Sequence, residues 1–133
     1  MNTSNSVPSA VANLKTSILR FLLAHGCDVS FVEMEDEIPG FKGTDCSWHI
    51  GDTNVVIWPW LSDAAADALF SLRHDGLLEL EPCDPLVYFI DGEIPRLPVA
   101  KKPPKKGFSK PHWLPCVLGL TPSGKAASLR LQP

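Results

Sequence analysis

The densest cluster of charge in the sequence is a lysine-rich segment over residues 101–110. It holds five lysines in ten residues with no acidic residue, together with stiffening prolines and a glycine, Gly107, where the backbone can turn. A stiff cationic loop suits contacts with the phosphates of a nucleic acid. We therefore assign backbone binding, assisted by Arg73 and Lys125, to Lys101, Lys102, Lys105, Lys106 and Lys110. The alternative is that these lysines only face solvent, as runs of charge often do.

Two short cysteine–histidine pairs have metal-ligand chemistry. Two residues separate Cys46 from His49 and three separate His112 from Cys116, which are spacings that a zinc ion accepts. The combination is not a standard zinc arrangement, however, and tryptophans beside both pairs indicate apolar packing. Cys116 near His112 is also a candidate thiol–imidazole pair for nucleophilic catalysis, but no orienting group or oxyanion hole accompanies it. We expect no enzymatic activity and no cofactor; the alternative is a metal-dependent enzyme built on these four residues.

A third feature is the face of an expected helix over residues 62–75 that points away from its core stripe. Asp63, Asp67, Phe70 and His74 recur there at helical intervals. DNA phosphates would repel the two carboxylates, so this face is unsuited to a groove. An exposed Phe70 favours docking to a protein partner or to a second copy of the chain. The alternative is that a long loop over residues 91–111 folds over Phe70.

Composition limits the classes of protein that carry these features. The chain has 133 residues, of which 44% are hydrophobic and 20% charged, as expected for one domain over 9–133 behind a flexible tail over 1–8. The net charge of −3 means that any DNA binding must depend on a local patch. No apolar run approaches the length of a membrane span, and the first residues lack the pattern of a secretory signal. We expect a cytoplasmic protein with free thiols and no membrane partner.

Periodicity and capping residues predict the elements that position these features. Helices are expected over 9–25, 62–75 and 122–130. Strands are expected over 28–34, 46–50, 54–58, 77–81, 86–90 and 113–120. The strand over 54–58 should end at Pro59, the strands over 77–81 and 86–90 should form a hairpin, and the acidic stretch over 35–43 should be a loop. The four tryptophans are expected in the core.

Residues 61–129 resemble the winged helix-turn-helix superfamily. The matching pieces are Ser62 as a helix cap, Ala68, Leu69 and Leu72 in the helix, Asp75-Gly76-Leu77-Leu78, and Leu120-Thr121-Pro122-Ser123-Gly124-Lys125-Ala126. The resemblance implies an α+β winged-helix-like fold with two to three helices, a small antiparallel sheet and a long proline- and lysine-rich loop. It also implies DNA binding through that loop. Two departures are a strand over 54–58 in place of the helix that normally precedes the recognition helix, and an acidic recognition helix.

A second similarity is to the C-terminal domains of conjugative relaxases from integrative elements. It depends on the order of a leading helix with Phe21-Leu22, a strand containing His49, and an apolar strand over 55–59 that ends in proline. This resemblance implies an association with mobile elements. The sequence thus predicts a small, non-enzymatic DNA-binding protein, and the alternative is a protein-interaction module or homodimer that uses the Phe70 face.

Overall fold

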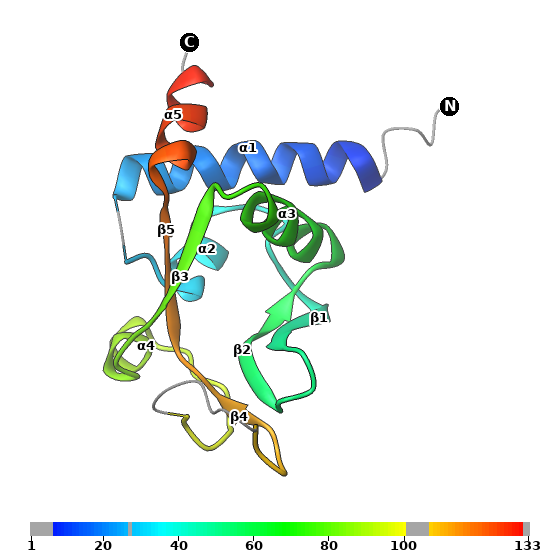
Figure 1. Cartoon of the computed structure of the whole chain (residues 1–133), viewed down its shortest axis with the longest axis vertical. Coiled ribbons are helices and arrows are strands. Elements are labelled where there is room, and N and C mark those ends of the chain that lie inside the picture. Colours follow the sequence, from blue (N-terminus) through cyan, green and yellow to red (C-terminus); the bar gives the residue numbers. More distant parts are fainter. Residues whose placement is uncertain (1–6, 27, 101–106, 132–133) are drawn as a thin grey trace.

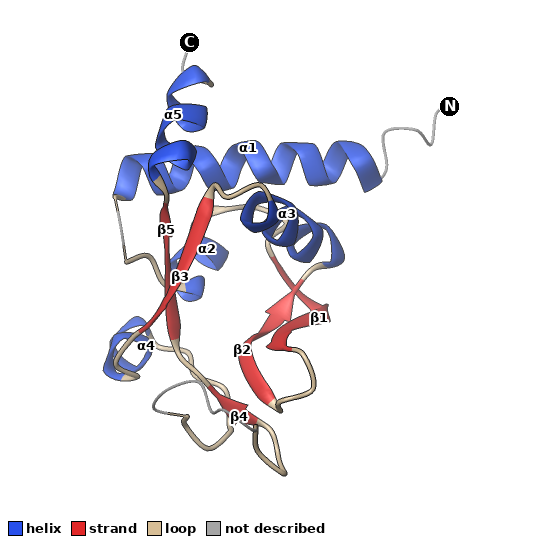
Figure 2. Cartoon of the chain, in the orientation of Figure 1, coloured by secondary structure: helices blue, strands red, loops and turns tan. Residues whose placement is uncertain are grey.

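A computed structural model of the chain describes residues 7–26, 28–100 and 107–131. The fold is mixed α+β, as the sequence predicted (Figure 1). The described elements are α1 (Val7–His25), α2 (Phe31–Glu37), β1 (Lys42–Ile50), β2 (Val55–Leu61), α3 (Asp63–His74), β3 (Leu78–Pro82), α4 (Leu86–Asp91), β4 (His112–Trp113), β5 (Cys116–Leu120) and α5 (Pro122–Arg130). Figure 2 shows α1, α3 and α5 gathered at one end, with the strands extending away from them.

The three helices expected from periodicity are confirmed, but α2 and α4 are additional, so the expected number of two to three helices is too low for the described residues. α1 buries Leu14, Ile18 and Leu22, which recur on one face, and packs against α3 and α5 (Figure 1). α3 and α5 begin where the sequence places their caps, because the Ser62 and Thr121 hydroxyls accept hydrogen bonds from backbone N–H groups of the first turn. The helices therefore begin at signals that the sequence carries locally.

The strands form two small sheets. β3 and β5 are antiparallel neighbours, and Val29 adds an antiparallel bridge to Leu118 on the other side of β5. In the second sheet β2 lies between β1, which is antiparallel to it, and β4, which is parallel to it. The expectation of a small antiparallel sheet is therefore met by β3–β5, while the β2–β4 pairing was not foreseen.

The strand expected over 28–34 is wrong beyond Val29, because this segment turns into α2. The Ser30 hydroxyl accepts the Glu33 N–H, and the Glu33 side chain accepts the Ser30 N–H, which together form a capping box. The same helix replaces the first part of the loop expected over 35–43. β1 then begins at Lys42, earlier than the expected strand over 46–50.

The hairpin expected from 77–81 and 86–90 is also wrong, because residues 86–90 are helical. A short run that is apolar throughout fits a buried strand or a helical turn equally well by periodicity. In α4 one residue, Tyr88, is buried, while Leu86, Phe89 and Ile90 are exposed. β3 pairs instead with β5, which lies far along the chain. The connection over residues 83–115 therefore contains α4, the lysine-rich segment and β4.

Pro59 does not end its strand, since β2 continues to Leu61. β4 pairs only with Val55 and Val56, so Pro59 lies where β2 lacks this neighbour and its missing N–H is tolerated. The continuation brings the Trp60 ring to 5.1 Å from the Trp58 ring. Trp48, Trp58 and Trp113 are buried, which confirms that these tryptophans belong to the core.

The centre of the core is an aromatic cluster that joins α2, β2, α4 and β4. The Trp58 ring stacks on Phe31 at 5.5 Å and contacts Tyr88 at 5.2 Å, while Tyr88 meets the edge of Trp113 at 5.2 Å. The Tyr88 hydroxyl donates to the Cys116 carbonyl at 2.6 Å and accepts the Phe31 N–H at 3.1 Å. These bonds attach α4 to α2 and β5.

Candidate functional site

The lysine-rich segment lies only partly within the described residues. Lys101, Lys102, Lys105 and Lys106 lie outside them, whereas Lys110 is exposed just before β4. Backbone hydrogen bonds hold both described ends of the segment, one end to β4 and the other to the turn before β2. The Ala100 N–H donates to the Trp113 carbonyl at 2.7 Å, and the Phe108 N–H donates to the Thr53 carbonyl at 2.8 Å. The segment therefore begins and ends at fixed points near β4.

The two residues expected to assist these lysines do not lie together with Lys110. Lys125 is exposed on α5, at the opposite end of the molecule from β4 (Figure 1). Arg73 is exposed in the last turn of α3, where its guanidinium carbon lies 5.7 Å from the centre of the Trp48 ring. The described part of the chain thus does not assemble one positive patch from Lys110, Arg73 and Lys125.

The predicted face of α3 is exposed, and β1 adjoins it. Asp63, Asp67, Phe70 and His74 are all exposed. The Cys46 thiol of β1 donates to Asp63 Oδ1 at 2.9 Å. The Phe70 ring meets Trp48 edge-on at 5.3 Å and remains 43% exposed. Trp48 thus provides part of the cover for Phe70 that the sequence alternative had assigned to residues 91–111.

A shallow hollow of about 300 Å³ lies at the C-terminal end of this face. It is lined by Trp48, Phe70, Arg73 and His74. An aromatic ring, a guanidinium group and an imidazole can together contact an apolar side chain that carries an acidic neighbour. Helical spacing predicted Phe70 and His74 for this face. It did not predict Trp48, because no spacing rule connects a strand residue with a helix that follows a further strand.

The cysteine–histidine residues do not form a metal site. Among the residues that the structure describes, no three histidine, cysteine, aspartate or glutamate side chains are placed to hold a metal ion. Cys46 is engaged with Asp63, and Cys116 is buried in β5. The His112 ring stacks on Phe108 at 3.7 Å, and its Nδ1–H donates to the Lys110 carbonyl. The hypothesis of a site built on Cys46, His49, His112 and Cys116 therefore has no geometric support.

The described thiols are also poor nucleophiles at neutral pH. The hydrogen bond to the Asp63 carboxylate raises the pKa of Cys46 to about 11. Burial raises the pKa of Cys83 to about 11 and that of Cys116 to about 12. A thiol needs its thiolate form to attack a substrate or bind a metal. All three are therefore protonated in the range where most enzymes work.

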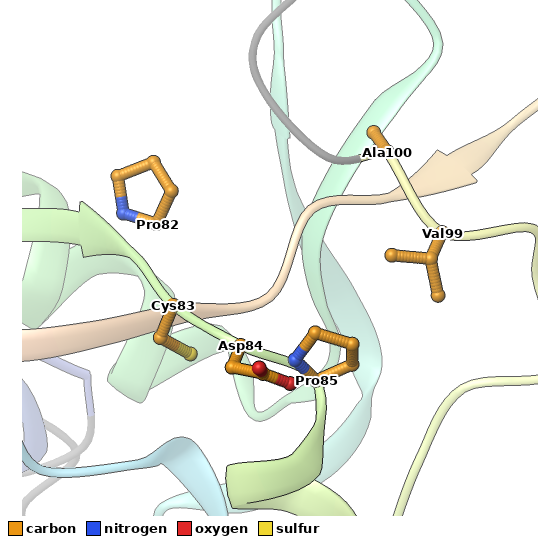
Figure 3. A pocket seen from close by; sticks show the side chains of 6 residues that line it. All are labelled: Pro82, Cys83, Asp84, Pro85, Val99 and Ala100. Atoms are coloured by element: carbon orange, nitrogen blue, oxygen red, sulfur yellow. The ribbon is translucent and has the colours of Figure 1, made fainter.

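A larger hollow, of about 540 Å³, lies where β3 meets α4 (Figure 3). Val99 and Ala100 lie across it from Cys83, Asp84 and Pro85. Asp84 Oδ1 accepts the Leu86 N–H at 2.9 Å and so helps to begin α4. With its thiol protonated and its carboxylate engaged in the turn, this hollow offers an apolar surface rather than an assembled reaction centre.

The structure pairs a buried carboxyl group, Glu35, with the partly exposed Glu93, which the sequence does not predict. The Glu35 side chain is 3% exposed, and its Oε2 accepts the Trp58 indole N–H at 2.8 Å. Burial, followed by a hydrogen bond to Glu93, raises the pKa of Glu35 to about 8. The same hydrogen bond lowers the pKa of Glu93, whose Oε2 also accepts from Lys42 Nζ at 3.1 Å. Glu35 therefore holds the shared proton.

This carboxyl pair ties α2, β1 and β2 to the segment that follows α4. No local motif predicts it, since the residues come from separate parts of the chain. Glu35 was instead placed in an acidic loop. A buried carboxyl group with a pKa near neutrality is a feature of many active sites, but structural pairs shift pKa values in the same way.

None of the described helices has the length and apolar character needed to cross a membrane. No protein-family model, curated protein or solved structure matches this chain.

Proposed function

We propose that this chain is an elaborated winged helix that forms a homodimer through the exposed face of α3. The winged-helix part of the proposal is supported by the order of the elements. α1 is followed by the Val29 bridge, α2, α3, β3 and β5. β5 lies between two antiparallel neighbours, Val29 and β3. The family that residues 61–129 resemble has this arrangement, in which a short first strand completes a sheet made by the two strands of the wing.

In this interpretation the two unusual features of the chain are insertions. The β1–β2 hairpin lies between α2 and α3, and the connection over 83–115 takes the place of the wing. α2 then corresponds to the helix that normally precedes the recognition helix. It lies ahead of the inserted hairpin rather than after it. The inserted β1–β2 hairpin thus explains why the resemblance covers only the later part of the chain.

The α3 face is unsuited to DNA. A recognition helix needs an exposed face that tolerates phosphates on both sides of the groove. Here Asp63 and Asp67 project from the first half of the helix, and β1 packs beside it through Cys46 and Trp48. A half-exposed phenylalanine flanked by charges is better suited to contact with a protein than to insertion into a DNA groove.

The order of charges along α3 is the observation that carries the homodimer. Asp63 and Asp67 precede Phe70, and Arg73 and His74 follow it, so the helix is acidic before its exposed phenylalanine and basic after it. Two copies of α3 packed antiparallel about a two-fold axis near Phe70 would set each acidic half against a basic half. Such a self-complementary surface is what an isologous interface requires.

Sedimentation velocity across a concentration series tests the homodimer. The wild type should show a monomer–dimer equilibrium, and Phe70→Asp should be monomeric because a charge replaces the central apolar contact. Phe89→Asp is the matched control, since Phe89 is 57% exposed on α4 and lies outside the proposed interface. A wild type that remains monomeric up to about 0.5 mM would remove the proposal. A dissociation constant above that concentration is weaker than an interface of standard size provides.

A charge exchange tests the orientation of the two helices. Asp67→Lys and Arg73→Glu should each weaken dimerisation, because like charges would then meet across the axis. The double variant should recover most of the lost affinity. Recovery distinguishes antiparallel α3 packing from a dimer that uses another surface, in which the double variant would show the sum of the two single effects.

Nucleic-acid binding is the second candidate, and the position of the lysine-rich segment favours it. The segment lies in the connection between β3 and β5, which is the place of the wing in the proposed arrangement, and its described ends are fixed near β4. DNA binding should weaken steeply with salt. Replacing Lys101, Lys102, Lys105, Lys106 and Lys110 by alanine should abolish it. Equal affinity of this variant and the wild type would end this candidate.

A further inference from the structure

A third, apolar hollow lies between the two sheets. It has a volume of about 200 Å³, and its walls come from β1, β2, α3, β3, β5 and the segment that joins β4 to β5. Ile57, Leu114 and Cys116 line it and are each only 2% exposed, so they form a closed floor. The buried Trp48 and the exposed Ile50 also line it. Apart from the buried Cys116 thiol, the lining is therefore aliphatic and aromatic, with one exception.

The exception is Arg73, which lies at the rim and has no acidic partner there. The contacts between a basic group and a carboxyl group that the structure describes join Lys42 to Glu35 and to Glu93, and Arg73 takes part in none within the described ranges. Its guanidinium carbon lies over the Trp48 ring at 5.7 Å, and Trp48 also lines the hollow. Its charge also reaches the floor, because Arg73 lowers the pKa of Cys116 against the larger, opposite effect of burial.

We propose that this hollow between the sheets binds a small apolar carboxylate, with the hydrocarbon group on Ile57 and Leu114 and the carboxylate on Arg73. Ligand sites are typically apolar hollows with a few polar groups that fix orientation, which is the arrangement here. A guanidinium group without an acidic partner selects a carboxylate, since it can donate two parallel hydrogen bonds to it. The charge of Arg73 thus indicates that the ligand carries a carboxylate.

The size of the hollow limits the ligand. A volume of about 200 Å³ is below the range of about 300–1,000 Å³ that drug-sized ligands occupy. A single ring or a short branched chain fits, whereas a long fatty acid does not. Benzoate is therefore a suitable probe, and benzamide has the same shape without the charge.

Titration of ¹⁵N-labelled protein with the two probes tests the site. The indole N–H signal of Trp48 should shift with benzoate and saturate. Benzamide should need at least about ten times the concentration, because a charge-assisted bond contributes more than a neutral one. The titration should be carried out on both the wild type and Phe70→Ser, since Phe70 does not line this hollow and serine places no carboxylate beside Arg73. Binding retained in Phe70→Ser, which lacks the central apolar contact of the proposed dimer, separates this site from the dimer.

Variants at the rim assign the carboxylate contact to one residue. Arg73→Met keeps much of the side-chain length but removes the charge, so benzoate should bind it no better than benzamide binds the wild type. Arg73→Lys should recover part of the preference for the anion. Arg96→Met is the matched control at another exposed arginine, and it should bind benzoate as the wild type does. Absence of saturable shifts, equal affinity for the two probes, or full benzoate binding by Arg73→Met would each overturn the proposal.

Discussion

The Trp58 indole N–H donates a hydrogen bond to Glu35 across the interior, joining β2 to α2 at 2.8 Å. The same carboxyl group is paired with Glu93, which accepts from Lys42 Nζ. Four polar groups from separate parts of the chain thus satisfy one another at the edge of an aromatic core. Such a network stabilises the fold only while Glu35 keeps the proton that it shares with Glu93.

Replacing Glu35 by glutamine should make stability less dependent on pH. The pKa of Glu35 rises from 4.5 to about 8 on folding, so the native state holds a proton that the unfolded chain has lost. This group therefore disfavours folding increasingly as pH rises from about 4.5 to about 8. Glutamine keeps an acceptor for Trp58 and a donor for Glu93 without ionising. At pH 9 Glu35→Gln should be roughly 1–3 kcal/mol more stable than the wild type, and at pH 5 nearly equal to it.

Urea unfolding at several pH values measures this difference. Glu37→Gln is the control, because Glu37 is an exposed carboxylate on the same helix. It should shift stability by less than about 0.5 kcal/mol at every pH. A stability difference between Glu35→Gln and the wild type that did not grow with pH would contradict the assignment of the proton to Glu35.

Tyr88→Phe should destabilise the fold by about 1–3 kcal/mol. The substitution keeps the ring but leaves the Phe31 N–H and the Cys116 carbonyl without the hydroxyl that both contact. Tyr88 is fully buried, so water cannot replace that hydroxyl without a rearrangement of the core. The midpoint of chemical unfolding measures the effect. Phe89→Leu, on the exposed side of the same helix, should change it little; comparable losses in the two variants would show that the hydroxyl is not what matters.

Gly124→Ala should destabilise the protein although alanine favours helices. A Cβ at position 124 would clash with the Leu77 carbonyl oxygen, so α5 would have to move away from the chain that enters β3. Helix propensity would contribute about 1 kcal/mol in the other direction, which is less than the usual cost of such overpacking. Thermal unfolding should show a lowered midpoint. Ser123→Ala, at the exposed neighbouring position, is the control, and a Gly124→Ala midpoint at or above that of the wild type would rule out the close contact.

Asp63→Asn should make Cys46 react faster with alkylating reagents. The hydrogen bond to the Asp63 carboxylate is the largest cause of the rise in the pKa of Cys46 from 9.0 to about 11, and Asp67 contributes less. Without that charge the thiolate fraction at pH 8 should increase. Mass spectrometry of the Cys46 peptide after iodoacetamide pulses should show a several-fold faster reaction. Asp67→Asn should have a smaller effect, and equal rates in the two variants would contradict the hydrogen-bond assignment.

The sequence determined the features whose cause is local. α1, α3 and α5 were predicted because apolar periodicity and the caps Ser62 and Thr121 act within a few residues. The exposed stripe with Asp63, Asp67 and Phe70 was predicted for the same reason, since helical geometry alone puts these side chains on one face. The net negative charge and the lysine-rich segment are likewise visible without a structure.

Tertiary structure decided what local patterns leave open. Residues 86–90 are helical rather than a strand because burying Tyr88 between Phe31 and Cys116 satisfies its hydroxyl, while β5 fills the place beside β3. Trp48 beside Phe70, Arg73 above the hollow between the sheets, and the proton shared by Glu35 and Glu93 all depend on contacts between distant parts of the chain. A short apolar run or a single charged residue does not specify which distant residues it will contact. Packing of the whole chain selects those contacts.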